Sequence, residues 1–129
     1  RSMNTRTSIR SAEMYLIAAE AAAHLDGKLD EAKGYLSSLQ AKRFTPDGAA
    51  AKAAEVEGLD QTGLLAEIAD ERAREFLMEG HRWLDLRRTT RPQITKEYEG
   101  QSYVLQANDP RYTLPYPQSA IENNPDLNN

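Results

Sequence analysis

Apolar residues recur every three or four positions along the first part of the chain, which is the spacing of one face of an α-helix. This face runs through Ile9, Ala12, Leu16, Ala19 and Ala23. A second apolar stripe lies beside it, so we expect a helix from about Thr7 to Leu25 that is buried over a wide arc. Gly27 is a residue type that commonly ends a helix.

A second helix is predicted from about Leu29 to Arg43. Asp30 and Glu31 lie in its first turn, where the helix dipole favours acidic side chains. The connection between the two helices is so short that they must run antiparallel. Residues 7–43 are therefore predicted to form a helical hairpin of the kind that tetratricopeptide repeats stack, although the full repeat signature is absent.

The middle of the chain gives a weaker pattern. Over residues 44–58 the letters "TPDG" predict a turn, and "AAAKAAEVE" allows a short helix without a large apolar face. Asp60 is placed to cap a third helix over residues 61–79, which Gly80 ends. A fourth, short helix is predicted over about residues 82–88.

The tail, residues 92–129, has a different sequence pattern, in which tyrosines alternate with polar residues. This pattern predicts short strands or extended coil. The prolines of "LPYPQSAIENNPDL" leave room for a single helical turn, for which Ser119 and Glu122 have the spacing of a capping box.

The predicted fold class is mainly α, with tetratricopeptide-like helical hairpins and an irregular, Pro-rich C-terminal segment. The chain is expected to form a single helical region over residues 1–129. The helix formers Ala and Leu number 32, whereas the β-branched Val and Ile number only 7, which favours the same class.

Charged residues concentrate in the stretch "ERAREFLMEGHRWLDLRR". Glu71, Glu75 and Glu79 follow one another at spacings of four, so they form one row that repels itself unless cations face it. The candidate cations are Arg82, Arg87 and Arg88 after the Gly80 turn, Arg72 from the side, and Arg6 or Arg10 from the first helix. We predict a structural charge clamp made of Glu71, Arg72, Glu75, Glu79, Arg82 and Asp85.

A catalytic interpretation of the same stretch is weaker. Paired carboxylates perform acid–base chemistry in glycosidases, but no nucleophile lies in a recognisable elbow. Glu79 and His81 lack the ligand spacing of a metal site, and His24 is explained by its place at the end of a helix. We therefore predict no catalytic residue, no metal site and no cofactor.

The aromatic residues offer a different kind of candidate, because their rings could stack on sugars. Trp83 lies on an apolar helical face and is expected to be part of the core. Tyr98 is ambiguous, whereas Tyr103 and Tyr116 are retained as candidate ligand-binding residues.

Composition excludes several classes of protein. The net charge of −4 argues against a general nucleic-acid binder. The chain has no cysteine, so disulfides, thiolate metal sites and cysteine nucleophiles are excluded. No apolar run approaches the roughly 20 residues of a membrane span. The first residue is Arg1, and we expect the chain to be a piece of a longer protein.

Three ordered stretches resemble the SusD/RagB family. The charged stretch resembles its "E-R-R-x-E-[FL]-x-x-E-G-x-R-W-x-D-L-x-R" block. "RSAEMYLIAAEAAAHLDGKLDEA" resembles its helix pair, and "YTLPYPQSAIENNPDLNN" resembles its closing block. The departures are few: Ala73 stands for a usual Arg, Tyr116 for the middle Ile of "PIP", and Asn128 for a usual Gln.

The resemblance implies a C-terminal portion of a much longer protein. Members of this family are lipoproteins anchored on the outer face of the outer membrane of Bacteroidetes. They bind glycans or other nutrients without catalysis and pass them to a SusC-like, TonB-dependent transporter. Their ligand contacts lie mainly in variable loops outside the three blocks, so no ligand residue can be carried over to this chain.

Two other functions remain open on the residues alone. The first alternative is a free-standing helical-repeat adaptor that binds protein partners, and the second is a hydrolase that uses the Glu71 row. If the chain is a piece of a longer protein, it should expose apolar surface and self-associate when isolated, with weak or no binding of oligosaccharides.

Overall fold

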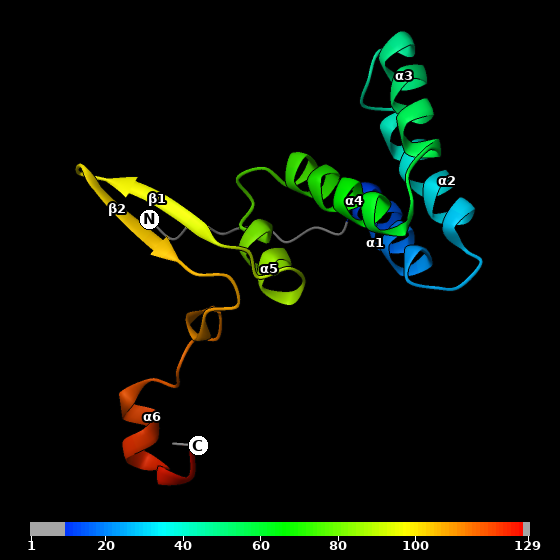
Figure 1. The fold of residues 1–129 in the computed structure, drawn as a ribbon. Helices are drawn as coiled ribbons and strands as arrows, with labels where there is room; N and C mark the ends of the chain where they lie inside the picture. The colour runs from blue at the N-terminus through cyan, green and yellow to red at the C-terminus, as the bar shows by residue number, and fades with distance from the viewer. Residues whose placement is uncertain (1–9, 128–129) are drawn as a thin grey trace. The chain divides into compact units, whose positions relative to one another are not determined.

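The computed structural model describes residues 10–127 of the chain. Most of them are helical, and they include one two-stranded sheet, which confirms the predicted mainly α fold class. The chain divides into two compact units (Figure 1). We call the part up to Arg82 the helical unit and the part from Trp83 the C-terminal unit.

The first two helices form the predicted hairpin. Helix α1 spans Ser11–Ala23 and helix α2 spans Leu29–Gln40. The turn between them contains Gly27 at a φ of 71°, a conformation that glycine adopts without strain. The predicted start of the first helix at Thr7 lies outside the described residues.

Helix α3 spans Pro46–Glu57, so the prediction of a turn at "TPDG" was wrong. These residues instead start the helix, because the Thr45 hydroxyl accepts a hydrogen bond from the Gly48 amide at 3.3 Å and a proline fits the first helical position. Val56 is the buried residue of α3. Lys33 of α2 donates to the Glu57 carbonyl at 2.6 Å and so ties the end of α3 to α2.

Helix α4 spans Gln61–Glu75 and begins as predicted, with the Asp60 carboxylate accepting from the Gly63 amide at 2.7 Å. It ends four residues before the predicted Glu79. In a continuing helix the Glu75 carbonyl would accept from the Glu79 amide, but the side chain of Arg10 takes that carbonyl at 3.1 Å. Met78 and Gly80 then have φ values of 66° and 82°, which lead into helix α5, His81–Arg88.

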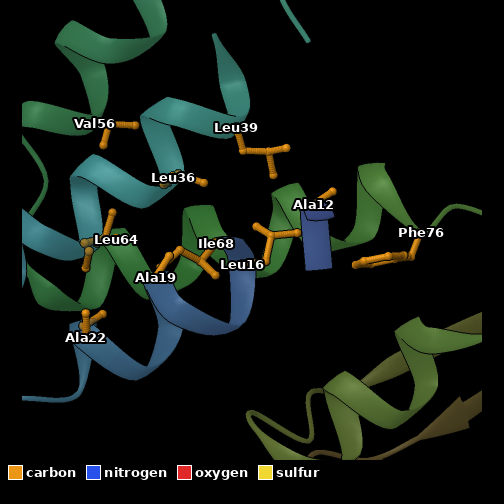
Figure 2. Packing of buried hydrophobic residues seen from close by; sticks show 12 residues of the cluster. Ala12, Leu16, Ala19, Ala22, Leu36, Leu39, Val56, Leu64, Ile68 and Phe76 are labelled. Carbon is orange, nitrogen blue, oxygen red and sulfur yellow. The ribbon is translucent and has the colours of Figure 1, made fainter. Parts of the chain in front are cut away.

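The core of the helical unit lies where α1, α2 and α4 meet. Figure 2 shows Leu16, Leu36, Leu64 and Ile68 from these helices converging, and each is at most 1% exposed. Four alanines on the buried face of α1 allow this close approach: Ala12, Ala19, Ala22 and Ala23. Small side chains on one helix and branched ones on its neighbours are thus what bring the three helices together.

The tail was predicted to form short strands or extended coil, and the C-terminal unit contains two short strands that pair as a β-hairpin. Strand β1, Ile94–Tyr98, pairs antiparallel with strand β2, Gln101–Leu105. The two residues between the strands, Glu99 and Gly100, both have positive φ values, 49° and 75°, as a type I′ turn requires. The remaining elements are short: a 3₁₀ turn η1 at Pro110–Tyr112, helix α6 at Gln118–Asn123 and a 3₁₀ turn η2 at Pro125–Leu127.

Two predictions for this unit need correction. Helix α6 starts at Gln118 after Pro117, without a side-chain cap, so the expected capping box of Ser119 and Glu122 does not form. Trp83 is 37% exposed instead of buried. Its ring stacks on Tyr112, which is fully buried, with the ring centroids 5.1 Å apart and the planes 6° from parallel, but this stack does not remove the whole indole from solvent.

The core predicts a clear difference between two leucines of the first hairpin. Replacing Leu16 with Ala should lower the free energy of unfolding by about 2–5 kcal/mol, because the shorter side chain leaves a cavity in the three-helix core. Leu25 is 60% exposed, so Leu25→Ala serves as the control and should change it by less than about 0.5 kcal/mol. Urea titration followed by circular dichroism measures both. Equal midpoints for the two variants would contradict this placement of the core.

Candidate functional site

The row of glutamates predicted on the third helix exists, and it is longer than predicted. Glu67, Glu71 and Glu75 lie at spacings of four along α4, and Glu79 follows in the turn after it. Glu67 was not among the predicted residues, although the same spacing extends the row to it.

Glu75 is held by an arginine that sequence analysis did not nominate. Arg43, just beyond α2, donates from Nε and Nη2 to the two carboxylate oxygens of Glu75 at 2.7 and 2.9 Å. Only 9% of the Glu75 side chain is exposed. The hydrogen bonds from Arg43 lower the pKa of Glu75, and those same bonds raise the pKa of Arg43. The pair therefore favours the charged form of both groups.

Glu71 is the most deeply buried member of the row, with 3% of its side chain exposed. It accepts hydrogen bonds from Arg74 at 2.7 Å and from the Gln40 amide at 3.0 Å. Glu67 shares both donors and also lies 3.1 Å from Lys52 of α3. The Gln40 side-chain oxygen is buried and has no hydrogen-bond partner among the described residues.

Glu79 contacts an arginine at the start of the first helix, which is one of the contacts predicted. Arg10 donates to the Glu79 carboxylate at 2.8 Å and, as noted above, to the Glu75 carbonyl. Its guanidinium also lies 4.8 Å from the centre of the Phe76 ring. One arginine therefore joins the start of α1 to the end of α4. The other candidate on that helix, Arg6, lies outside the described residues.

The remaining members of the predicted clamp are Arg82, Arg72 and Asp85. Arg82 donates to the Ala69 carbonyl at 3.2 Å and lies 3.9 Å from the Asp70 carboxylate. Arg72 is buried, with its guanidinium 5.3 Å from the centre of the Phe76 ring. Asp85, in the C-terminal unit, pairs with Arg88 at 3.0 Å. Arg82 thus contacts Ala69 and Asp70 instead of pairing with a glutamate of the row, and the clamp as a whole stays a prediction.

The chemistry of the row favours structure over catalysis. A general acid of a glycosidase needs a raised pKa, whereas the pKa of Glu75 is lowered by its arginine. Each of the four glutamates is bound to a cationic side chain, so none is left to act on a substrate. Among residues 10–127, no group of three His, Asp or Glu side chains is arranged to hold a metal ion.

The predicted ligand-binding tyrosines both lie on the surface of the C-terminal unit. Tyr103 in β2 is 52% exposed, and its hydroxyl donates to the Gln101 side chain at 2.8 Å. Tyr116 is 58% exposed and stands between two prolines ahead of α6. Tyr98, on the neighbouring strand, is 64% exposed and shares a face of the hairpin with Tyr103. The alternation of tyrosines with polar residues in the sequence indicated that each strand has two faces. The register of β1 with β2 is needed to show that Tyr98 and Tyr103 share one of them.

Comparison with known proteins identifies one family. The model of the SusD family matches residues 1–129, the whole chain, which confirms the resemblance carried by the three sequence blocks. Membership of this family indicates a nutrient-binding role at the cell surface, and its members are non-catalytic binding proteins. No curated protein matches the chain. None of the helices within the described residues has the length and apolar character needed to cross a membrane.

The pair of Arg43 and Glu75 predicts that Arg43→Ala destabilises the helical unit by about 1–3 kcal/mol, because a charge-assisted bidentate contact is lost and Glu75 keeps its partly buried charge. Arg82→Ala is the matched control. Since half of the Arg82 side chain is exposed, its loss should cost about 0–1 kcal/mol. Urea unfolding of both variants measures the difference, and a larger loss for Arg82→Ala would show that the clamp is centred on Arg82 instead.

The lowered pKa of Glu75 also predicts a dependence on pH. Its folded pKa lies below the unfolded value of about 4.3, so its stabilisation is complete above that pH and is lost as the pH falls through the folded pKa. Between about pH 6 and about pH 3 the wild type should therefore lose more stability than Glu75→Gln, which has no carboxylate to titrate there. Urea midpoints across this range provide the measurement. Parallel curves for the two proteins would be evidence against the paired state of Glu75.

Proposed function

The chain belongs to the SusD family, and from that premise we propose that it takes part in non-catalytic binding and uptake of a glycan at the bacterial cell surface. Its partner in this role is a SusC-like, TonB-dependent transporter of the outer membrane, which receives the nutrient. The family match over the whole chain is the observation that carries this proposal. Each of the four glutamates of the row is paired with a cation, which supports the non-catalytic part of the proposal.

We further propose that the full-length protein is a lipoprotein of a Bacteroidetes bacterium, anchored on the outer face of the outer membrane. The 129 residues contain no cysteine, so the lipid-bearing residue would belong to another part of the full-length protein. The helical hairpin of α1 and α2 would serve as scaffold, as its tetratricopeptide-like form suggests. In this chain, Tyr103 and Tyr116 are the proposed ligand contacts, because both rings are exposed.

A deletion experiment tests the proposed uptake. Removing the coding segment for residues 1–129 in the natural host should abolish growth on one glycan as sole carbon source while growth on a monosaccharide continues. Restoring the segment should restore growth, whereas an in-frame restoration carrying Leu16→Ala tests dependence on the folded helical unit. Unchanged growth on every glycan of a broad panel would refute the proposal.

A helical-repeat adaptor remains the second candidate, because α1 exposes apolar side chains on its outer side. Met14 is 55% exposed and Ile17 is 48% exposed, and both lie one turn apart on that helix. Such surface is typical of a face that another protein or another part of the same protein covers. The adaptor function would use this face for a protein partner.

The same face predicts self-association of the isolated chain. Light scattering should give a mass above that of the monomer, because burying exposed apolar area contributes about 25 cal/mol per Å². Replacing both Met14 and Ile17 with Lys should restore the monomer, whereas Leu77→Lys, at a residue that is 73% exposed in the turn after α4, is the control. A monomeric wild type, or a Leu77→Lys monomer, would show that this face is not the contact.

A further inference from the structure

The β-hairpin presents its aromatic and its charged residues on different faces. In an antiparallel pair, opposed residues point to the same side, and successive residues of a strand alternate between sides. The register opposes Tyr103 to Lys96, and Tyr98 to Gln101. One side is therefore formed by Ile94, Lys96, Tyr98, Gln101, Tyr103 and Leu105, and we call it the tyrosine face. The other side carries no aromatic residue and includes Glu97.

We infer that the tyrosine face binds the acidic unit of a negatively charged glycan, and that Lys96 selects for its negative group. This inference rests on the proposed function, which supplies a glycan as the nutrient, and it adds the chemical class. Its basis is the combination of two exposed rings and one cation on a single face. Lys96 lies directly opposite Tyr103, and no hydrogen bond or ion pair engages its ammonium within the described residues.

The geometry suits a sugar ring. Tyr98 and Tyr103 are diagonal neighbours across the strands, which places their Cα atoms about 7–8 Å apart. Tyrosine offers an apolar ring surface and a polar end, so it covers the C–H side of a sugar ring while its hydroxyl end meets solvent. The bond from the Tyr103 hydroxyl to Gln101 orients this ring, and the Gln101 amide nitrogen remains able to donate to a sugar hydroxyl.

The charge distribution favours an anionic ligand on this face over a neutral one. Although the chain as a whole carries a net charge of −4, the two acidic residues near Lys96 in the hairpin lie off the tyrosine face: Glu97 is on the other side and Glu99 is in the turn. Lys96 is therefore the cation that a carboxylate or sulfate would meet there. Uronic acids and sulfated sugars share this chemistry, because both place a fixed negative charge on a sugar ring.

A protein strand is a less suitable occupant of the hairpin than a sugar. Strand addition would use the unpaired backbone groups along an outer edge of the hairpin. On the β2 edge, the Val104 carbonyl already accepts a hydrogen bond from Arg111 at 3.2 Å, and Arg111 is itself held by Asp109 at 2.7 Å. A strand added at the β2 edge would have to displace this arginine, whereas a ligand on the tyrosine face leaves it in place.

Titration of the ¹⁵N-labelled 129-residue chain, followed by NMR, tests the inference. The probes are a neutral trisaccharide, a trimer of uronic acid and a sulfated trisaccharide. Because binding by the isolated chain is expected to be weak, we expect small amide shifts at β1 and β2 with the charged sugars and still smaller shifts with the neutral one. Which of the two charged sugars binds more tightly identifies the negative group. Added salt should weaken the charged sugars alone, because it screens the exposed lysine.

Three variants make the test specific. Lys96→Gln should weaken binding of the charged sugar by about two- to fivefold, as expected for an exposed ion pair, and leave the neutral sugar unchanged. Tyr103→Ala should weaken binding of all three sugars. Tyr103→Phe should retain the part of the affinity that comes from stacking of the ring on the sugar. Lys42→Gln makes the same change of charge at an exposed lysine of the helical unit and should have no effect. Unchanged hairpin signals in the free variants establish that the fold is kept.

Three outcomes would overturn the inference. Equal binding of neutral and charged sugars would remove the role of Lys96. Shifts confined to residues outside the hairpin would place the ligand elsewhere and leave the proposed uptake function standing. The absence of shifts with every sugar would count against glycan binding by this chain as well as against the tyrosine face.

Discussion

The glutamate row of α4 is the constraint on which the helical unit depends. Neighbouring carboxylates at spacings of four destabilise an isolated helix by a few tenths of a kcal/mol per pair. In the folded chain Arg74 of α4 itself faces Glu67 and Glu71, and further cations come from three places outside the helix: Arg10 before α1, Arg43 after α2 and Lys52 in α3. The repulsion along the row is thus fully offset only when the other helices pack around α4. The repulsion between these carboxylates disfavours the isolated helix, and the ion pairs made in the folded chain offset it.

Signals from neighbouring residues predicted the helices of the helical unit well. They failed for contacts between residues that are far apart in the sequence. The cap at Asp60 and the glycine turn at Gly27 are properties of neighbouring residues, and the structure contains both. The partner of Glu75 is set by how α2 ends beside α4, so a pattern along one helix pointed to Arg82 and not to Arg43. An antiparallel hairpin does place the end of α2 beside the start of α1, and that rule was the signal from which Arg43 could have been nominated.

The C-terminal unit was predictable in type but not in detail, for a different physical reason. It buries little: Tyr112 is its fully buried large side chain, fixed by the stack with Trp83 and by a hydrogen bond from its hydroxyl to the Pro92 carbonyl. Alternation along a strand indicates that the strand has two different faces. It does not indicate which residues of the partner strand lie on each face. That information lies in the turn, because Glu99 and Gly100 fix the register of the hairpin.

The two units use charge in opposite ways, and this difference separates scaffold from candidate site. In the helical unit the buried glutamates of α4 are paired with cationic side chains of the same unit, so their hydrogen bonds stabilise the fold. On the hairpin, Lys96 is opposed to Tyr103 and exposed to solvent, so its charge is expected to add little to the stability of the fold. Residues that stabilise a fold little can change without unfolding it, which lets a surface vary with its ligand while the scaffold is kept. The four paired glutamates of the row and the exposed tyrosines of the hairpin are therefore consistent with the proposal that this chain holds a nutrient and does not cleave it.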